Sequence, residues 1–371
     1  MKRQAIAAGV LGIAALSVLL GAQQPSVVEA LDGVDPVLLV EGKEVSGKPD
    51  LKVVRGRFEY LFSSAATRAA FEIDPAKYEI QLNGACARMG GGVQGNPSDF
   101  AVVDKKIYIF GSDDCHKKFV ATPAKFLPRA APPMPARAAD LERGRALVEQ
   151  AVAAMGGAAA LDAVTTYVES ASQVQKRPDG DVPVTTRTTW QFPGRVRAER
   201  TMAVQGRTMT SGMLITPDGG WFLGQGRAFP QNAEGKKTSE QEYGRQLLPL
   251  LRTRHDAAFK AAAVGVAVVE GVDVDRVRVE NGTVDVTLGL DRKSGRVRSL
   301  SFTGRNQAAE FGEYTLVFDD YRAVSGLMLP FDVRALFDGA PDGFRTIKLD
   351  AIAINTPVDP SLFEIPKADG K

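Results

Sequence analysis

The sequence has 371 residues, of which 46 are basic and 44 are acidic, with 44% apolar residues, two cysteines and two histidines. At about 150 residues per domain, this length predicts about two domains. The balanced charge disfavours a disordered chain and a nucleic-acid-binding protein. So few cysteines and histidines exclude a zinc-finger array or several metal centres.

The N-terminal segment has the pattern of a secretory signal. Lys2 and Arg3 precede an apolar run that ends at Ala22. We predict a signal peptide at residues 1–22, with cleavage after Ala22 or as late as Ala30. An uncleaved anchor is the alternative, because the run is near the minimum length for a membrane span. The segment has no cysteine, so the protein is not expected to be a lipoprotein. Without the two leading basic residues the counts are 44 and 44, which leaves no excess positive charge for nucleic acid or anionic membrane.

A first module is expected at residues 31–127. Its elements follow in the order Gly56-Arg57, Tyr60-Leu61-Phe62-Ser63-Ser64, Phe71, Asp74-Pro75, Lys77-Tyr78, Asn83-Gly84-Ala85-Cys86-Ala87 and Gly95-Asn96-Pro97. This ordered set resembles the YHS domain. The resemblance implies a small recognition or metal-handling module. The chain has Ser63 where the family often has a cysteine, and this departure argues against carrying metal binding over.

The two cysteines, Cys86 and Cys115, both fall in this module. An even pair in an exported protein predicts a disulfide, which stabilises by about 3–4 kcal/mol for a loop of this length. Free thiols are a further option. A copper or zinc site is the alternative, with ligands drawn from Cys86, Met89, Cys115 and His116, completed by Asp113 or Asp114. The glycine-rich segment 89–95 lacks the Lys-Ser/Thr pair of a phosphate-binding loop and is expected to be a plain loop.

Residues 128–139 read PRAAPPMPARAA and predict a semi-rigid linker, because proline lacks an N–H and has a fixed φ. The second module, residues 140–371, opens with a helix that Asp140 caps and Gly156-Gly157 ends. Strands dominate after it, with a hairpin turn at Asn281-Gly282 and one further helix near residues 241–260. Apolar and polar residues alternate along these strands, so we expect a large antiparallel sheet with one buried face.

The second module also carries an ordered set of motifs. They are Met155-Gly156-Gly157 with Leu161, Trp190 with Pro193-Gly194-Arg195 and Arg197, Asp218-Gly219-Gly220-Trp221, Asp291–Gly295, Phe318-Asp319-Asp320-Tyr321, Gly326-Leu327, Leu329-Pro330-Phe331, and Asp359–Pro366. This set is similar to the outer-membrane lipoprotein-sorting superfamily. The resemblance implies an α+β fold in which a curved antiparallel sheet, or half-barrel, is closed by helices. Its cavity can accept acyl chains or other apolar ligands.

Two groups of residues are candidates for such a site. Large apolar side chains predict the lining, or else a filled core: Trp190, Phe192, Met209, Met213, Leu214, Trp221 and Phe222. Arg195 and Arg197 share one face of a strand. They could hold a carboxylate or phosphate head group, or pair with acidic residues at the surface.

No Ser/His/Asp or paired-carboxylate pattern indicates catalysis, so we expect a protein that is not an enzyme and has no cofactor. The sequence favours an exported binding protein, periplasmic or secreted. Its partners would be a hydrophobic small molecule, a lipid, an acylated protein or other envelope proteins. A periplasmic copper or zinc protein and a purely structural envelope module are the alternatives.

Overall fold

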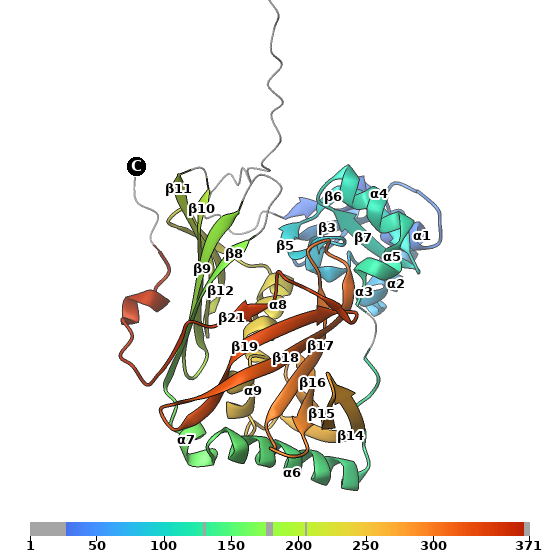
Figure 1. Cartoon of the computed structure of the whole chain (residues 1–371). Coiled ribbons are helices and arrows are strands. Elements are labelled where there is room, and N and C mark those ends of the chain that lie inside the picture. Colours follow the sequence, from blue (N-terminus) through green and yellow to red (C-terminus); the bar gives the residue numbers. More distant parts are fainter. Residues whose placement is uncertain (1–26, 129–130, 176–180, 205, 367–371) are drawn as a thin grey trace, which may run out of the picture.

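The computed structural model describes residues 27–366 except 129–130, 176–180 and 205 (Figure 1). The predicted signal peptide therefore lies outside the described residues. Within them, no helix is both long and apolar enough to cross a membrane.

The first module contains two small sheets and five short α-helices. One sheet has the order β1 (Val28–Glu29), β3 (Phe58–Phe62), β2 (Lys48–Arg55), and the other has the order β5 (Gly90–Gln94), β4 (Ala85–Cys86), β7 (Lys106–Phe110), β6 (Asn96–Val103). The helices are α1 (Pro36–Val40), α2 (Ala65–Ile73), α3 (Pro75–Tyr78), α4 (Asp113–Ala121) and α5 (Pro123–Phe126). The predicted aromatic packing is present, since Phe71 of α2 contacts Tyr60 and Phe62 with ring centres 4.9 and 5.2 Å away.

A buried carboxylate organises the start of this module. Asp35 is fully buried and caps α1 by accepting a hydrogen bond from the Val37 amide at 3.0 Å. Its other oxygen accepts hydrogen bonds from the Ser63 amide, the Ser63 hydroxyl and the Thr67 hydroxyl at 2.6–2.8 Å. Ser63 is thus a partner of this carboxylate through both its amide and its hydroxyl.

The second module begins with α6 (Ala138–Met155) and α7 (Ala158–Asp162) and then forms two antiparallel sheets. The seven-stranded sheet has the order β13 (Arg227–Pro230), β12 (Gly219–Gly224), β11 (Arg207–Thr216), β10 (Arg195–Val204), β9 (Val182–Gln191), β8 (Thr166–Gln175), β22 (Ala351–Ile354). The eight-stranded sheet has the order β14 (Lys260–Val269), β15 (Val272–Asn281), β16 (Val284–Asp291), β17 (Val297–Arg305), β18 (Phe311–Val324), β19 (Leu327–Phe337), β20 (Ala340–Pro341), with β21 (Ile347–Lys348) also paired to β19. The predicted hairpin at Asn281-Gly282 is confirmed between β15 and β16.

One short segment joins the two sheets. β21 pairs with β19, and β22, two residues later, pairs with β8. Between them the Leu349 amide donates to the Phe331 carbonyl and the Asp350 amide donates to the Ser170 carbonyl. The two sheets therefore form one curved wall, which confirms the expected α+β class and the curved antiparallel sheet. Figure 1 shows α8 (Ala233–Gly244) and α9 (Leu247–Arg252) between the sheets and α6 beneath them.

Three sequence-based assignments need correction. Helix α6 begins at Ala138, inside the predicted linker, and Asp140 lies in its first turn, where it accepts hydrogen bonds from Arg137 and does not cap the helix. The helix predicted at 241–260 is instead α8 and α9, which end at Arg252, and residues from Lys260 onward belong to β14. Hydrophobic spacing located its apolar part, since Leu247, Leu248 and Leu251 are buried, but the polar helix α8 has no such pattern. The glycine-rich segment expected as a loop forms strand β5, and η3 (Pro360–Phe363) closes the C-terminal part.

The two modules pack directly on each other. Strand β5 lies so close to the start of α8 that a Cβ on Gly91 would be 2.3 Å from the Gly235 nitrogen. Arg305 of β17 reaches into the first module and donates hydrogen bonds to the carbonyls of Ala87, Arg88 and Phe126. Burial lowers the pKa of this guanidinium to about 10. Backbone oxygens thus hold the buried charge at the contact between the modules.

Candidate ligand cavity

A cavity of about 430 Å³ lies between the two sheets of the second module. Its polar wall comes from strands β8 and β9 and contains Tyr167, Glu169, Gln173, Thr186, Thr188 and Trp190. Its apolar wall comes from β18 and β19 and from helix α9 and contains Leu316, Phe318, Leu329, Val333, Leu247 and Leu248. The volume falls within the range of about 300–1,000 Å³ that is usual for small-molecule sites.

The strand period explains how β9 supplies this wall. Side chains two apart share a face, so Val182, Val184, Thr186, Thr188 and Trp190 all point inward. Cross-strand pairing places Thr188 beside Glu169 of β8 and Ala198 of β10. The indole ring of Trp190 packs against Tyr167, with ring centres 5.0 Å apart.

Tyr167 and Glu169 form a buried polar pair on β8. The tyrosine hydroxyl donates a hydrogen bond to the Glu169 carboxyl group. Burial raises the pKa of Glu169 to about 7, because the charged form loses its hydration, and the hydrogen bond from Tyr167 opposes this rise. Burial also raises the pKa of Tyr167 well above its ordinary value. Near neutral pH the cavity therefore contains a carboxyl group that is close to half protonated.

Two arginines share one carboxylate at the other end of the cavity. Arg345 donates to Glu242 at 2.8 Å, and Arg245 donates to the second oxygen of the same group. Burial acts to raise the pKa of Glu242, but the two guanidiniums hold it below its usual value. Arg245 also lies 3.7 Å above the centre of the Phe302 ring. Two positive charges thus meet one negative charge at this end, which leaves a net positive charge of one.

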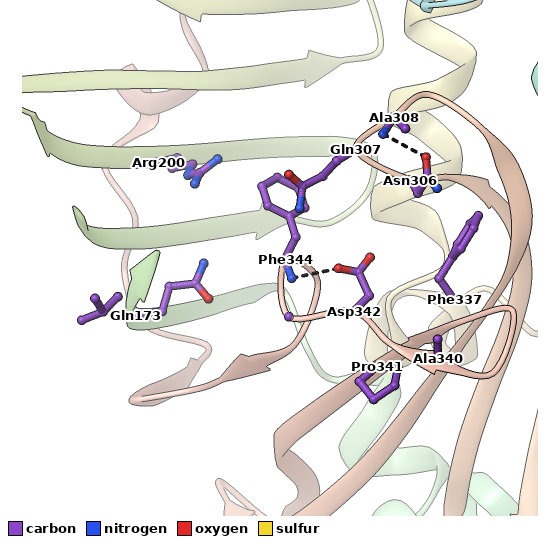
Figure 2. Close-up of a pocket in the computed structure, with 12 residues that line it drawn as sticks. Gln173, Arg200, Asn306, Gln307, Ala308, Phe337, Ala340, Pro341, Asp342 and Phe344 are labelled. Atoms are coloured by element: carbon purple, nitrogen blue, oxygen red, sulfur yellow. Dashed lines mark hydrogen bonds between the residues drawn. The ribbon is translucent and has the colours of Figure 1, made fainter. Parts of the chain in front are cut away.

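A second cavity, of about 640 Å³, adjoins the first, and Figure 2 shows the residues that line it. The two cavities share Gln173, Arg200 and Phe344, and the Arg200 guanidinium lies 5.5 Å from the centre of the Phe344 ring. Phe344 belongs to a loop in which its amide donates to Asp342 at 2.8 Å. The pair formed by Arg200 and Phe344 therefore lies at the boundary between the two cavities.

A third cavity, of about 360 Å³, lies against the first module. Gly90, Gly91 and Gly92 of β5 form part of its wall, and it shares Glu242 and Arg345 with the central cavity. The central cavity thus shares lining residues with both of the other two cavities.

The structure brings only one of the predicted lining residues, Trp190, into the wall of the central cavity. Phe192 and Met213 pack against the main core, Met209 is 51% exposed, and Phe222 is half-buried and faces β5. The placement of Leu214 and Trp221 corrects the expectation. They belong to a separate cluster with Leu223 and Phe363, on the sheet face that η3 covers (Figure 1).

The predicted head-group arginines also lie away from the cavity. Arg197 donates to Glu199 at 2.8 Å and to the Leu362 carbonyl, and exposed Arg195 donates to Gln191. Arg197 is thus paired with an acidic residue in a part-buried position, whereas Arg195 bonds to an amide. The next arginine along β10 is Arg200, three positions after Arg197. Its side chain therefore lies on the opposite face of the strand, and it does line the cavity.

The structure also differs from the predicted disulfide and from the metal alternative. Cys86 and Cys115 are free, buried thiols in the same small core, so the disulfide is not formed here and stays a prediction. Among the described residues, no group of three or more His, Cys, Asp or Glu side chains could hold a metal ion. His116 bonds instead to Asp99 at 2.5 Å and stacks on Phe110, and Met89 is 39% exposed.

The polar residues of the cavity were not predicted from the sequence. Strand parity from Trp190 back to Val182 would have placed Thr186 and Thr188 on the inner face. No comparable signal links Glu242 to Arg345, which are 103 positions apart. Their pairing depends on the fold.

No protein-family model matches the chain, and no curated protein matches it. Among solved structures it is similar to a DUF1329 family protein from Desulfovibrio piger, with 11% identity over 61% of this chain and 97% of that one, and a TM-score of 0.41. It is also similar to a LolA superfamily protein from Nitrosomonas europaea, with 10% identity over 60% of this chain and 97% of that one, and a TM-score of 0.40. A third similar structure is a domain from Vibrio parahaemolyticus described as an outer membrane lipoprotein-sorting protein. It is 10% identical over 60% of this chain and 97% of that one, with a TM-score of 0.38. Likenesses this distant leave the ligand to be argued from the side chains of this chain.

Proposed function

We propose that this protein is an exported binding protein of the cell envelope, without enzymatic activity, that holds a hydrophobic ligand between its two sheets. The observation that carries the proposal is the central cavity of about 430 Å³, which has an apolar wall of leucine, phenylalanine and valine side chains. Such a wall favours transfer of apolar surface out of water. The export step rests on the basic and apolar pattern of residues 1–22.

Two of the three glutamates that line the cavity are committed to ion pairs, which supports binding rather than catalysis. Glu242 is engaged by Arg245 and Arg345, and Glu199 is engaged by Arg197. These carboxylates are held by ion pairs, as structural groups are, and not presented to a substrate. The first module, which resembles the YHS domain, would act as a recognition module for a lipid-bearing or envelope partner.

Ligand binding can be tested with N-phenyl-1-naphthylamine, whose fluorescence rises in apolar surroundings. We expect the purified full chain to bind this probe. Ala198→Phe places a ring in the cavity and should weaken binding about tenfold or more. Thr185→Phe is the matched control, because Thr185 is exposed on the outer face of the neighbouring strand. Absence of probe binding, or equal binding by both variants, would exclude the cavity as the site.

A further inference from the structure

The third cavity has an excess of positive charge in its wall. It is lined by Arg245, Arg305 and Arg345. Arg245 and Arg345 bond to the two oxygens of one carboxylate, that of Glu242, so this trio has a net positive charge of one. Arg305 donates to backbone carbonyls, and no carboxylate in the described part of the chain forms an ion pair with it. The cavity of about 360 Å³ is therefore bordered by two positive charges that these residues leave unpaired.

The other charged side chains of the wall do not offset this excess. Lys237 and Glu234, both on α8, are one cation and one anion. Asp285 is exposed on β16, where it shares Arg278 with Glu280. This second trio has one net negative charge, but both of its carboxylates are partly open to water, which screens them. The positive charge at the cavity therefore remains.

Burial suits the Arg245 guanidinium to an anionic partner. Its side chain is only 10% exposed, and the guanidinium carbon lies 3.7 Å from the centre of the Phe302 ring. The lost hydration lowers the pKa of Arg245 to about 10, so the group is still charged near neutral pH. Among the described residues, Glu242 is the one group to which this guanidinium donates. An oxyanion beside it would replace the missing hydration, and a guanidinium can hold such a group through two parallel hydrogen bonds.

The glycine-rich strand β5 keeps one side of the cavity free of side chains. This side is formed by Gly90, Gly91 and Gly92. A Cβ on Gly90, whose φ is +83°, would lie 3.4 Å from the guanidinium carbon of Arg305, and one on Gly91 would lie 2.3 Å from the Gly235 nitrogen. A side chain at Gly91 would therefore push the modules apart, and one at Gly90 would crowd Arg305. The segment lacks the Lys-Ser/Thr pair of a phosphate-binding loop, so its contribution is open space beside the arginines.

We propose that the third cavity binds an oxyanion, a phosphate or carboxylate group, at Arg245 and Arg345. This site goes beyond the proposed function, which concerns the apolar surface of the central cavity. The two cavities share Glu242 and Arg345, so the oxyanion is either the head group of the central-cavity ligand or a free anion. Either source presents the same chemistry to the arginines, and the first module closes the site through β5.

The test measures oxyanion binding to the full chain in two ways. Inorganic phosphate is titrated into the protein by calorimetry, and decyl phosphate is compared with 1-decanol in the displacement of N-phenyl-1-naphthylamine. A head group at the arginines predicts that decyl phosphate displaces the probe at about one tenth of the concentration that decanol requires. A free anion predicts that inorganic phosphate binds by itself and that the two competitors displace the probe equally.

Two substitutions change the charge of the site in opposite directions. Glu242→Gln raises the net charge of its trio from one to two and should tighten the observed phosphate binding about tenfold. Arg345→Gln lowers that charge to zero and should weaken the binding about tenfold, whereas displacement by decanol should not follow the charge. Glu142→Gln and Arg227→Gln make the same charge changes at exposed positions and should bind as the wild type does. A loosened fold can weaken binding, but it does not account for tighter binding in Glu242→Gln.

The outcomes separate this inference from the proposed function. If the probe does not bind, the proposed function fails, and the titration with inorganic phosphate still tests the oxyanion site. The inference is overturned if inorganic phosphate does not bind and decyl phosphate does not displace the probe better than decanol. It is also overturned if phosphate binding is the same in Glu242→Gln, Arg345→Gln and the wild type, because the anion then binds away from these arginines.

Discussion

Replacement of Glu169 by glutamine tests the electrostatic description of the cavity. Glutamine keeps an oxygen that can accept the hydrogen bond of Tyr167 but cannot ionise. The pKa of Glu169 is about 7 in the folded protein, against 4.5 for an unperturbed glutamate. Between these values the folded state binds more protons than the unfolded state, so the free energy of unfolding must fall as pH rises.

The size of this effect follows from the two pKa values. Their difference corresponds to about 3 kcal/mol, present at pH 4.5 and below and lost by about pH 8. We therefore expect Glu169→Gln to match the wild type near pH 4.5 and to be more stable by up to about 3 kcal/mol at pH 8.5. Water that reaches the carboxyl group through the cavity would reduce this value.

Urea unfolding followed by tryptophan fluorescence is a suitable assay, because both tryptophans, Trp190 and Trp221, lie in the second module. The measured quantity is the difference in unfolding free energy between variant and wild type at several pH values. Glu142→Gln, an exposed position on α6, is the control and should show a nearly constant difference. If the Glu169→Gln difference is as flat with pH as the control, then Glu169 is not held in a desolvated state and the reasoning is refuted.

Three further predictions concern the first module and its contact with the second. Arg305→Leu removes the hydrogen bonds to three carbonyls of the first module and should cost about 2–4 kcal/mol. Trypsin should cleave the linker faster in this variant than in the control Arg227→Leu, and equal rates would contradict the assigned contact. Asp35→Ala removes five hydrogen bonds and should destabilise the first module by about 3 kcal/mol, seen by calorimetry as an earlier transition; an unchanged melting profile would count against it. Thiol titration in denaturant without reductant should find two thiols per chain, as the structure has Cys86 and Cys115 free, whereas none would establish the disulfide predicted from the sequence.

Local patterns in the sequence predicted much of the fold of the second module. The hairpin at Asn281-Gly282 follows from a turn with strong conformational preferences between alternating strands. Helix α6 follows from apolar residues at helical spacing that end at Gly156. Helix α8 was missed because its residues are mostly polar, and it is stabilised by packing between two sheets that are distant in sequence.

The cavity residues were harder to predict, and Leu214 and Trp221 show the reason. Their size indicates burial, and they are partly or fully buried, but the cover is the C-terminal segment around Phe363 rather than the cavity. Strand parity tells which residues share a face. It does not tell which face is concave, because that depends on segments about 140 positions further along the chain. The same limit applies to Arg197 and Arg200, which lie on opposite faces of β10. Arg197 contacts the C-terminal segment at Leu362, whereas Arg200 lines the cavity.

The segment that joins the two sheets also explains why one cavity can have two different walls. The strands with the polar wall and those with the apolar wall come from separate halves of the module, and β21 and β22 hold them edge to edge. The loop just before this joint contributes Phe344 to the boundary with the second cavity and Arg345 to the boundary with the third cavity. The same backbone segment therefore closes the curved wall and places Phe344 and Arg345. A change in this loop is expected to affect both the joint between the sheets and the access of a ligand to the central cavity.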